Sequence, residues 1–295
     1  MIEIERIAKM NKSGNFKMKI KKIISSINNV KQLKAGIILL ALIILLAIFA
    51  PLIATHDPFE LNDDMVSPPS NNYILGTDGL GRDIFSGILY GARTSILIGV
   101  VAASISGIMG TLIGGISGFY GGKIDAVLSE VINVFLMMPT FFLILIIVAL
   151  FGSSMFNVMV VIGITTWTGN ARLMRAEALS LKQRTFVKSL ETIGESKFKI
   201  LLKHIIPNGI FPIIANTTMN VSDAILTESA LSFLGLGDPN VMSWGQIVYN
   251  GKSYLTNGWW ISTFSGIAIV LTVLAFYLIG DGMNNILSPK LNSNN

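Results

Sequence analysis

The chain has 295 residues, of which 52% are hydrophobic and only 13% are charged, and its formal net charge is +5. Apolar runs of about 20 residues, the length of helix that crosses a bilayer core, recur along it. This composition excludes an ordinary soluble domain and predicts an all-α protein that crosses a membrane several times. Cysteine is absent, and His56 and His204 lie far apart in sequence, so we expect neither disulfides nor a metal site.

The hydrophobic runs predict six membrane-spanning helices, which cover residues 36–54, 94–120, 126–151, 156–170, 209–234 and 261–280. The predicted organisation is a basic segment (1–35), the first helix (36–54), an external loop (55–92), a core of helices two to six (93–284) and a short tail (285–295). The first apolar run is longer than the usual 7–15 residues of a signal-peptide core. This length favours a retained anchor over a cleaved signal peptide.

Basic residues gather in two of the predicted loops. Of the 22 Lys and Arg residues, nine precede the first span and eight lie in a polar loop, residues 172–208. Because basic loops stay on the cytoplasmic side, we expect a multi-pass protein of the cytoplasmic membrane with both termini inside. The basic N-terminal segment is interpreted as a topology determinant at anionic lipid. We expect no binding to nucleic acid.

Two features concern how the spans pack. Small residues recur every four positions along the second span and include Gly110, Gly114 and Gly118. This spacing lets two helix backbones approach closely in a membrane, either as static packing or as a contact within a moving core. Met138-Pro139 predicts a kink in the third span, because proline removes a backbone hydrogen bond.

The fifth span carries polar residues in an otherwise apolar run. Such residues usually face a bundle interior or a water-filled cavity. Candidates for lining a pathway are Asn216, Asn220, Asp223, Thr227 and Glu228. Asp223 and Glu228 are five residues apart, about 140° around a helix, so they are not expected on one face. Glu228 lies near the predicted outer end, where the alternative role is a cap or anchor.

The polar loop predicts two short amphipathic helices. Four apolar residues of the first fall at helical spacing, namely Phe186, Val187, Leu190 and Ile193. Gly194 then ends this helix, and Ser196 is a candidate N-cap for the second. The pair is expected to project as a knob that enters a groove on a partner. The alternative is a stripe that lies on lipid headgroups.

Several segments carry a resemblance to a known family. Phe186-Val187, followed by Gly194 and residues 204–208, resembles the cytoplasmic "EAA" loop of permeases of ATP-binding-cassette (ABC) importers. Further segments are similar to the dipeptide/oligopeptide/nickel-type permeases, specifically the subunit with a long external loop after its first helix. These segments are residues 75–83, 90–95, 228–237, 243–245 and 280–282.

The resemblance implies the type I ABC importer permease fold, with six transmembrane helices and a coupling loop between helices four and five. In that family the loop helix contacts an ATPase subunit. Carried over to this chain, the contact residues are Phe186, Val187, Lys188, Ser189, Leu190, Glu191, Ile193, Gly194 and Pro207. The chain departs from the family at Lys188-Ser189-Leu190, where Glu-Ala-Ala is usual, so the charge of the family's glutamate is reversed.

The resulting expectation is a permease subunit that imports di- or oligopeptides by alternating access. The alternatives are a nickel or metal-chelate permease of the same family and a proton-coupled secondary transporter. No phosphate-binding Gly-x-x-x-x-Gly-Lys-Ser/Thr motif occurs, so an enzyme is not expected. By resemblance, the partners are a homologous second permease, two ABC ATPases that hold ATP and Mg, an external solute-binding protein and the lipid bilayer. This chain itself is expected to bind no cofactor or metal.

Overall fold

The structure is a computed structural model that describes residues 30–287. Within this range its regular secondary structure is helical, apart from one isolated bridge between Thr77 and Asp83. The α-helices are α2 (Lys31–Ile48), α3 (Ala50–Ile53), α4 (Ile84–Tyr120), α5 (Gly122–Met137), α6 (Thr140–Phe151), α7 (Met155–Thr165), α8 (Thr168–Lys182), α9 (Thr185–Thr192), α10 (Lys197–Ile200), α11 (Ile206–Leu231), α12 (Trp244–Gly251) and α13 (Trp259–Leu287). Two π-helical turns, η1 (Leu201–Ile205) and η2 (Ser232–Leu236), flank α11, and a 3-10 turn, η3 (Lys252–Tyr254), follows α12. Most of the predicted basic segment and nearly all of the predicted tail lie outside the described residues.

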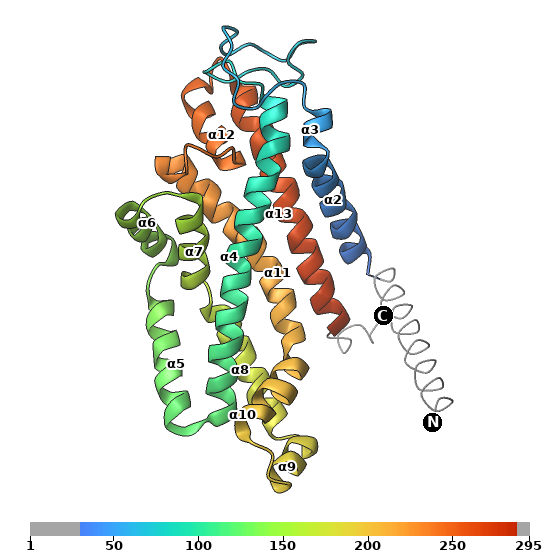
Figure 1. Ribbon diagram of the computed structural model, residues 1–295, viewed down its shortest axis with the longest axis vertical. Helices are drawn as coiled ribbons and strands as arrows, with labels where there is room; N and C mark the ends of the chain where they lie inside the picture. Colours follow the sequence, from blue (N-terminus) through green and yellow to red (C-terminus); the bar gives the residue numbers. More distant parts are fainter. Residues whose placement is uncertain (1–29, 288–295) are drawn as a thin grey trace, which may run out of the picture.

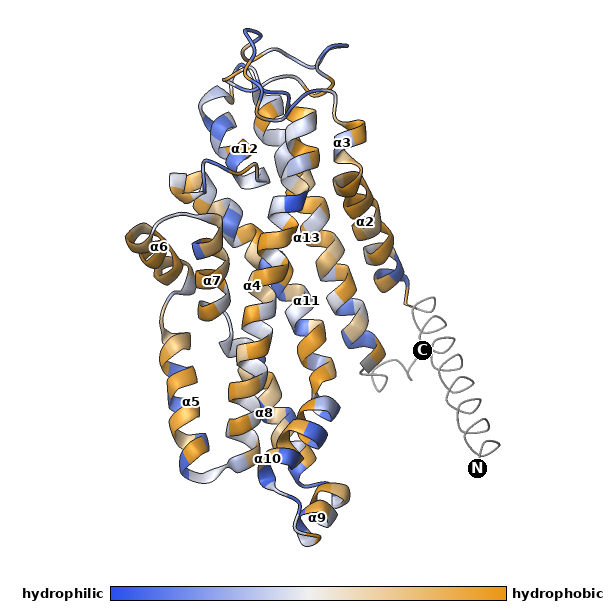
Figure 2. Ribbon diagram, viewed as in Figure 1, coloured by the Kyte–Doolittle hydropathy of each residue, from blue (hydrophilic) through white to orange (hydrophobic). Residues whose placement is uncertain are grey.

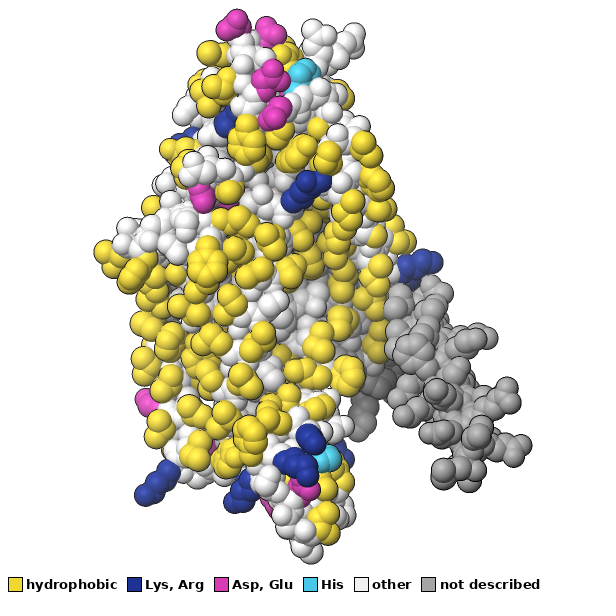
Figure 3. Space-filling view, viewed as in Figure 1, with side chains coloured by type: hydrophobic (Ala, Val, Ile, Leu, Met, Phe, Trp, Pro, Cys, Tyr) yellow, Lys and Arg dark blue, Asp and Glu magenta, His cyan; other side chains and the backbone are white. Residues whose placement is uncertain are grey.

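The long helices form an elongated bundle with α9 at one end and α12 at the other (Figure 1). Four helices are long and apolar enough to cross a membrane: Lys31–Ile48, Ile84–Tyr120, Lys197–Leu236 and Trp259–Ile286. Hydrophobic side chains cover the middle of the visible face, acidic ones gather at the α12 end, and Lys and Arg gather at the α9 end (Figure 3). The chain is therefore a multi-pass membrane protein.

By length and composition, not every one of the six predicted spans is a single helix that could cross a membrane alone. The third predicted span divides into α5 and α6, which are bent by 83° relative to each other. The break falls at Met138-Pro139, because Pro139 has no N–H to donate and the residue before a proline prefers extended backbone. The fourth predicted span shrinks to α7, whose 11 residues reach only about 16 Å. Within the described range, four helices are thus candidate spans by length and composition, or five if the bent pair counts as one.

Helix α4 begins at Ile84 rather than at the predicted Thr94, because Asp83 caps its N-terminus. The Asp83 carboxylate accepts hydrogen bonds from the Ser86 backbone N–H (2.9 Å) and hydroxyl (2.5 Å). The same oxygen accepts a bond from the Thr55 hydroxyl (3.0 Å), which ties the cap to the segment that follows α3. Capping by aspartate satisfies N–H groups that have no partner in the first turn.

Helix α2 is attached at both of its ends. Near Lys31, an ideal Cβ on Gly36 would lie 2.8 Å from the carbonyl oxygen of Ala275, so only glycine permits this approach of α2 to α13. Near α3, Pro51 cannot donate to the carbonyl of Ala47. Arg93 of α4 donates to this carbonyl instead (2.7 Å) and also to that of the next residue (3.1 Å). The arginine thus satisfies the Ala47 carbonyl that the proline leaves open.

The three glycines predicted to pack helices lie along the contact between α4 and α8. An ideal Cβ on Gly110 would lie 2.8 Å from both the N atom of Ala171 and the carbonyl oxygen of Trp167. A Cβ on Gly114 would collide with the Ala171 carbonyl oxygen, and one on Gly118 with that of the Arg175 backbone. Side chains at these positions would force the two helix backbones apart.

Candidate functional site

Residues 185–199 project from one end of the bundle and are called the α9 knob (Figure 1). Helix α9 ends at Thr192, and Gly194, two residues later, has a φ of +82°, a left-handed conformation that glycine adopts readily. The N–H of Glu195 bonds to the carbonyl of Leu190 (3.0 Å), as in a common helix C-terminal motif. Ser196 then caps α10 by accepting a bond from the N–H of Lys199 (3.4 Å). The sequence-predicted hinge and cap therefore occupy the expected positions.

The predicted apolar stripe of α9 divides into a buried edge and an exposed edge. Val187 is fully buried and packs with Phe119, Met174 and Ile200 of its own chain. Phe186 and Ile193 are 42% and 75% exposed. The contact role predicted for Val187 is therefore corrected to that of an anchor, and the surface open to a partner is the exposed edge.

The exposed apolar residues Phe186 and Ile193 share one side of α9 with the exposed Ser189. At 100° per residue, Phe186, Ser189 and Ile193 fall within an arc of about 60°. Lys188 and Thr192 lie on another side of the helix and are also exposed. Lys188 forms no ion pair with any residue in the described range. The Lys188 charge is thus exposed to solvent on a side of α9 next to the one that carries Phe186 and Ile193.

The second helix of the loop is not a separate piece, which corrects the prediction. Helix α10, η1 and α11 continue into η2 as one run of 40 residues from Lys197 to Leu236. Pro207 is the second residue of α11, as predicted for the start of the fifth helix, and it lies inside this longer run. The π turn shifts the hydrogen bonds so that the Ile206 N–H bonds to the Leu201 carbonyl just before the proline.

A clamp between α8 and α5 lies near this end of the bundle and was missed from the sequence. Arg175 donates from Nε and from its terminal nitrogen to the two carboxylate oxygens of Asp125, at 2.6 and 2.7 Å. Such two-pronged pairs are stronger and more directional than single bonds. Sequence reasoning counted Arg175 only as a basic loop residue, because its partner lies 50 residues away.

Four of the predicted pathway residues form a stripe along α11, called the polar stripe: Asn216, Asn220, Asp223 and Thr227. They fall within about 60° of one another around the helix and extend about 16 Å along it. None of the four is buried, and Asp223 is exposed. The middle of α11 accordingly shows hydrophilic colours between hydrophobic helices (Figure 2). Asn216 is held in place at one end by donating to the Asn170 side chain of α8 (2.9 Å).

Glu228 does not belong to this stripe, and its predicted role in lining the pathway is corrected. The residue is only 4% exposed, and its Oε1 accepts hydrogen bonds from the hydroxyls of Ser232 and Ser243, both at 2.8 Å. Ser243 is also the N-cap of α12, where it accepts a bond from the Gln246 N–H (3.1 Å). Glu228 therefore joins α11 to α12, which matches the alternative anchoring role.

We expect Glu228→Ala to lower the stability of the protein. The change leaves two buried hydroxyls without their acceptor and opens a small cavity, at a cost of about 2–4 kcal/mol. Glu228→Gln keeps a carbonyl oxygen and should cost less. The measurement is the thermal unfolding temperature of the purified protein. An unchanged unfolding temperature combined with lost transport would instead restore Glu228 to the pathway.

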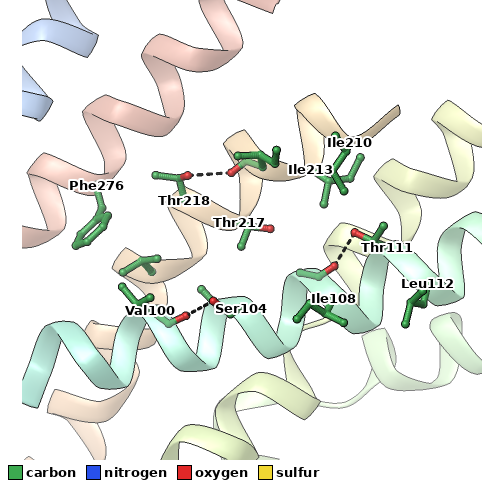
Figure 4. Close-up of a pocket in the computed structure, with 14 residues that line it drawn as sticks. Val100, Ser104, Ile108, Thr111, Leu112, Ile210, Ile213, Thr217, Thr218 and Phe276 are labelled. Atoms are coloured by element: carbon green, nitrogen blue, oxygen red, sulfur yellow. Dashed lines mark hydrogen bonds between the residues drawn. The ribbon is translucent and has the colours of Figure 1, made fainter. Parts of the chain in front are cut away.

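A cavity of about 480 Å³ lies between α4 and α11, on a different side of α11 (Figure 4). It is lined by Val100, Ala103, Ser104, Gly107, Ile108, Thr111, Leu112, Ile210, Ile213, Ile214, Thr217, Thr218, Val221 and Phe276. The hydroxyls of Ser104, Thr111 and Thr218 each donate to a carbonyl of their own helix. The wall is thus largely apolar, and it contains none of the predicted pathway residues. Its residues are dispersed over three helices, so no sequence pattern marked it.

Comparison with known proteins agrees with these features. The family described as "Binding-protein-dependent transport system inner membrane component" matches residues 110–293. The family described as "N-terminal TM domain of oligopeptide transport permease C" matches residues 34–71.

Two curated relatives span most of the chain. The probable D,D-dipeptide transport system permease protein DdpC of Escherichia coli (strain K12) is 38% identical over 255 residues, which cover 86% of each chain. The oligopeptide transport system permease protein OppC of Bacillus subtilis (strain 168) is 37% identical over 265 residues, covering 88% of this chain and 86% of the relative.

A solved structure of the MetNI methionine ABC transporter in inward-facing conformations is similar in fold. The TM-score is 0.55 at 15% sequence identity, and the match covers 68% of this chain and 96% of the other. This likeness confirms the predicted type I permease fold. Together with the sequence matches, it shows that the chain belongs to the family of inner membrane permease components of binding-protein-dependent transport systems.

Proposed function

We propose that the chain is one of two permease subunits of an ATP-driven importer of short peptides. The observation that carries this proposal is the exposed edge of the α9 knob, where Phe186 and Ile193 remain uncovered at the basic end of the bundle. This apolar surface lies beyond the hydrophobic middle of the bundle and is fixed in place by the buried Val187. An exposed apolar surface in that position is expected to bind a soluble protein partner. The names of the curated relatives supply the cargo class, di- and oligopeptides.

The partners follow from the same reasoning. The basic end faces the cytoplasm, so the α9 knob meets ATPase subunits there and both termini of the chain are cytoplasmic. Two such ATPases bind ATP and Mg, a homologous permease completes the pathway, and a solute-binding protein delivers cargo on the α12 side. This chain supplies the membrane path and the mechanical contact.

The mechanism is alternating access. When the ATPases close, they displace the α9 knob, which is fixed to its own chain by Val187. The continuous helix from Lys197 to Leu236 carries this displacement to the α12 end, where Glu228 links it to Ser243. The polar stripe of α11 lines the path of the cargo.

The test is transport by the complete complex. We expect the chain, purified with its native partners and reconstituted into vesicles, to accumulate labelled dipeptide only when ATP is present on the knob side. Uptake driven by a proton gradient without ATP would instead indicate a secondary transporter. ATP-dependent uptake of Ni²⁺ without peptide uptake would instead assign the chain to the metal-importing branch of the family.

A further inference from the structure

We infer that Asp223 is a cargo-recognition residue that binds the N-terminal ammonium group of the transported peptide. The inference extends the proposed function, on which it rests, by naming a chemical group of the substrate and the side chain that meets it.

The first observation is the position of Asp223. The residue lies well inside the 40-residue spanning helix and its side chain is exposed on the surface of the subunit. In the described range its carboxylate takes part in no ion pair and accepts no side-chain hydrogen bond, and the Thr227 hydroxyl donates to the backbone carbonyl of Asp223 instead (2.7 Å). An exposed carboxylate at this depth is costly in lipid and is found where it faces water or an opposite charge.

The second observation is the division of α11 into two chemically different sides. The side that faces the α4 cavity presents Ile213, Ile214 and Val221, with hydroxyls already bonded within their helices. Another side of α11, about 120° around the helix from the first, presents the polar stripe, with Asp223 between Asn220 and Thr227. Water and a polar solute therefore belong on the stripe side.

The third observation is the chemistry around the carboxylate. Asn220 and Thr227 each lie about one helical turn from Asp223, on either side of it. Asn220 supplies an amide, and the Thr227 hydroxyl, whose hydrogen is donated to the Asp223 carbonyl, supplies an acceptor oxygen. Asn216 uses its N–H₂ group to reach Asn170, which leaves its carbonyl oxygen as a fixed acceptor. One anion flanked by groups that donate and accept hydrogen bonds fits an ammonium group followed by peptide bonds. The stripe length of about 16 Å matches four or five extended residues.

The test compares transport rates of Asp223→Asn with those of the wild type in the reconstituted complex. Saturating amounts of peptide-loaded binding protein remove differences in delivery. We expect Asp223→Asn to lower the maximal import rate of a neutral dipeptide about tenfold, because a charge-assisted hydrogen bond is lost. Asp223→Glu, which keeps the charge, should retain most of the rate. The concentration of loaded binding protein at half-maximal rate and the basal ATPase rate should stay within about twofold.

Glu130→Gln is the matched control, since it removes an exposed carboxylate from α5, away from the stripe. Its import rate should remain that of the wild type. Wild-type import by Asp223→Asn would overturn the inference. So would loss of the second permease from the purified Asp223→Asn complex, because the carboxylate would then pair with a cation of that subunit. Failure of the wild-type complex to import any peptide would overturn the proposed function as well.

Discussion

Replacing Ile193 with aspartate is expected to abolish ATP-dependent import while the subunit still folds in the membrane. Ile193 is 75% exposed and follows the last turn of α9, so a charge there costs the isolated subunit little. The proposed ATPase contact would instead have to bury an unpaired carboxylate, which should reduce transport by more than about tenfold. Import by reconstituted vesicles and co-purification of the ATPase subunits measure the effect.

Thr192→Asp is the matched control for this prediction. It places the same charge on the neighbouring residue, which is exposed on a different side of α9. We expect this variant to retain ATPase binding and import. Equal loss in both variants would indicate that added negative charge, rather than the apolar edge, is what the partner rejects. Normal import by Ile193→Asp would show that the α9 knob is not the docking surface.

The second large effect is expected at Gly114. Even a methyl group there would collide with the backbone carbonyl oxygen of Ala171, which cannot move without displacing α8. Gly114→Ala should therefore destabilise the protein by at least about 2–3 kcal/mol, and Gly114→Val should prevent accumulation of folded protein. The yield of monodisperse protein after detergent extraction and its unfolding temperature report this loss.

Gly115 provides a control at the adjacent position of the same helix. An ideal Cβ there would meet only side-chain atoms, the nearest at 3.5 Å, which is an ordinary contact. Gly115→Ala should be neutral or slightly stabilising, because alanine favours the helix over glycine by about 1 kcal/mol. Similar destabilisation by both alanine variants would show that glycine content, not the approach of α8, is the requirement.

Hydropathy located the long helices well and the interrupted ones poorly. Helices α4 and α13 are continuous apolar runs, and their apolar length alone marked them as spans. Pro139 marked the site of the break between α5 and α6. It could not give the 83° angle, because that angle depends on the packing of Ile144 against residues such as Val158, distant in sequence. The apolar run of residues 156–170 merged α7 with the start of α8, since hydropathy does not detect the turn at Trp167.

Periodicity predicted which residues of the candidate site share one side of a helix, but not which of those residues are buried. It placed Val187 and Ile193 in one stripe, yet only the tertiary structure shows that Phe119 and Met174 cover the first and leave the second open. It also separated Asp223 from Glu228 around α11. Which of the two is buried depends on Ser243, a residue beyond the end of that helix. Partners of this kind cannot be read from the pattern of a single helix.

The two attachments of α2 limit how the bundle can deform. Gly36 fixes the helix to α13 near one end, and Arg93 of α4 fixes it near Pro51 at the other. Helix α2 therefore connects α13, which it contacts near one end, to α4, which it contacts near the other. Helices α4 and α13 can rotate about the two ends of α2, but the length of α2 and the hydrogen bonds of Arg93 limit how far apart they can move. Helix α2 thus sets an upper bound on the distance that these two helices can separate in each transport cycle.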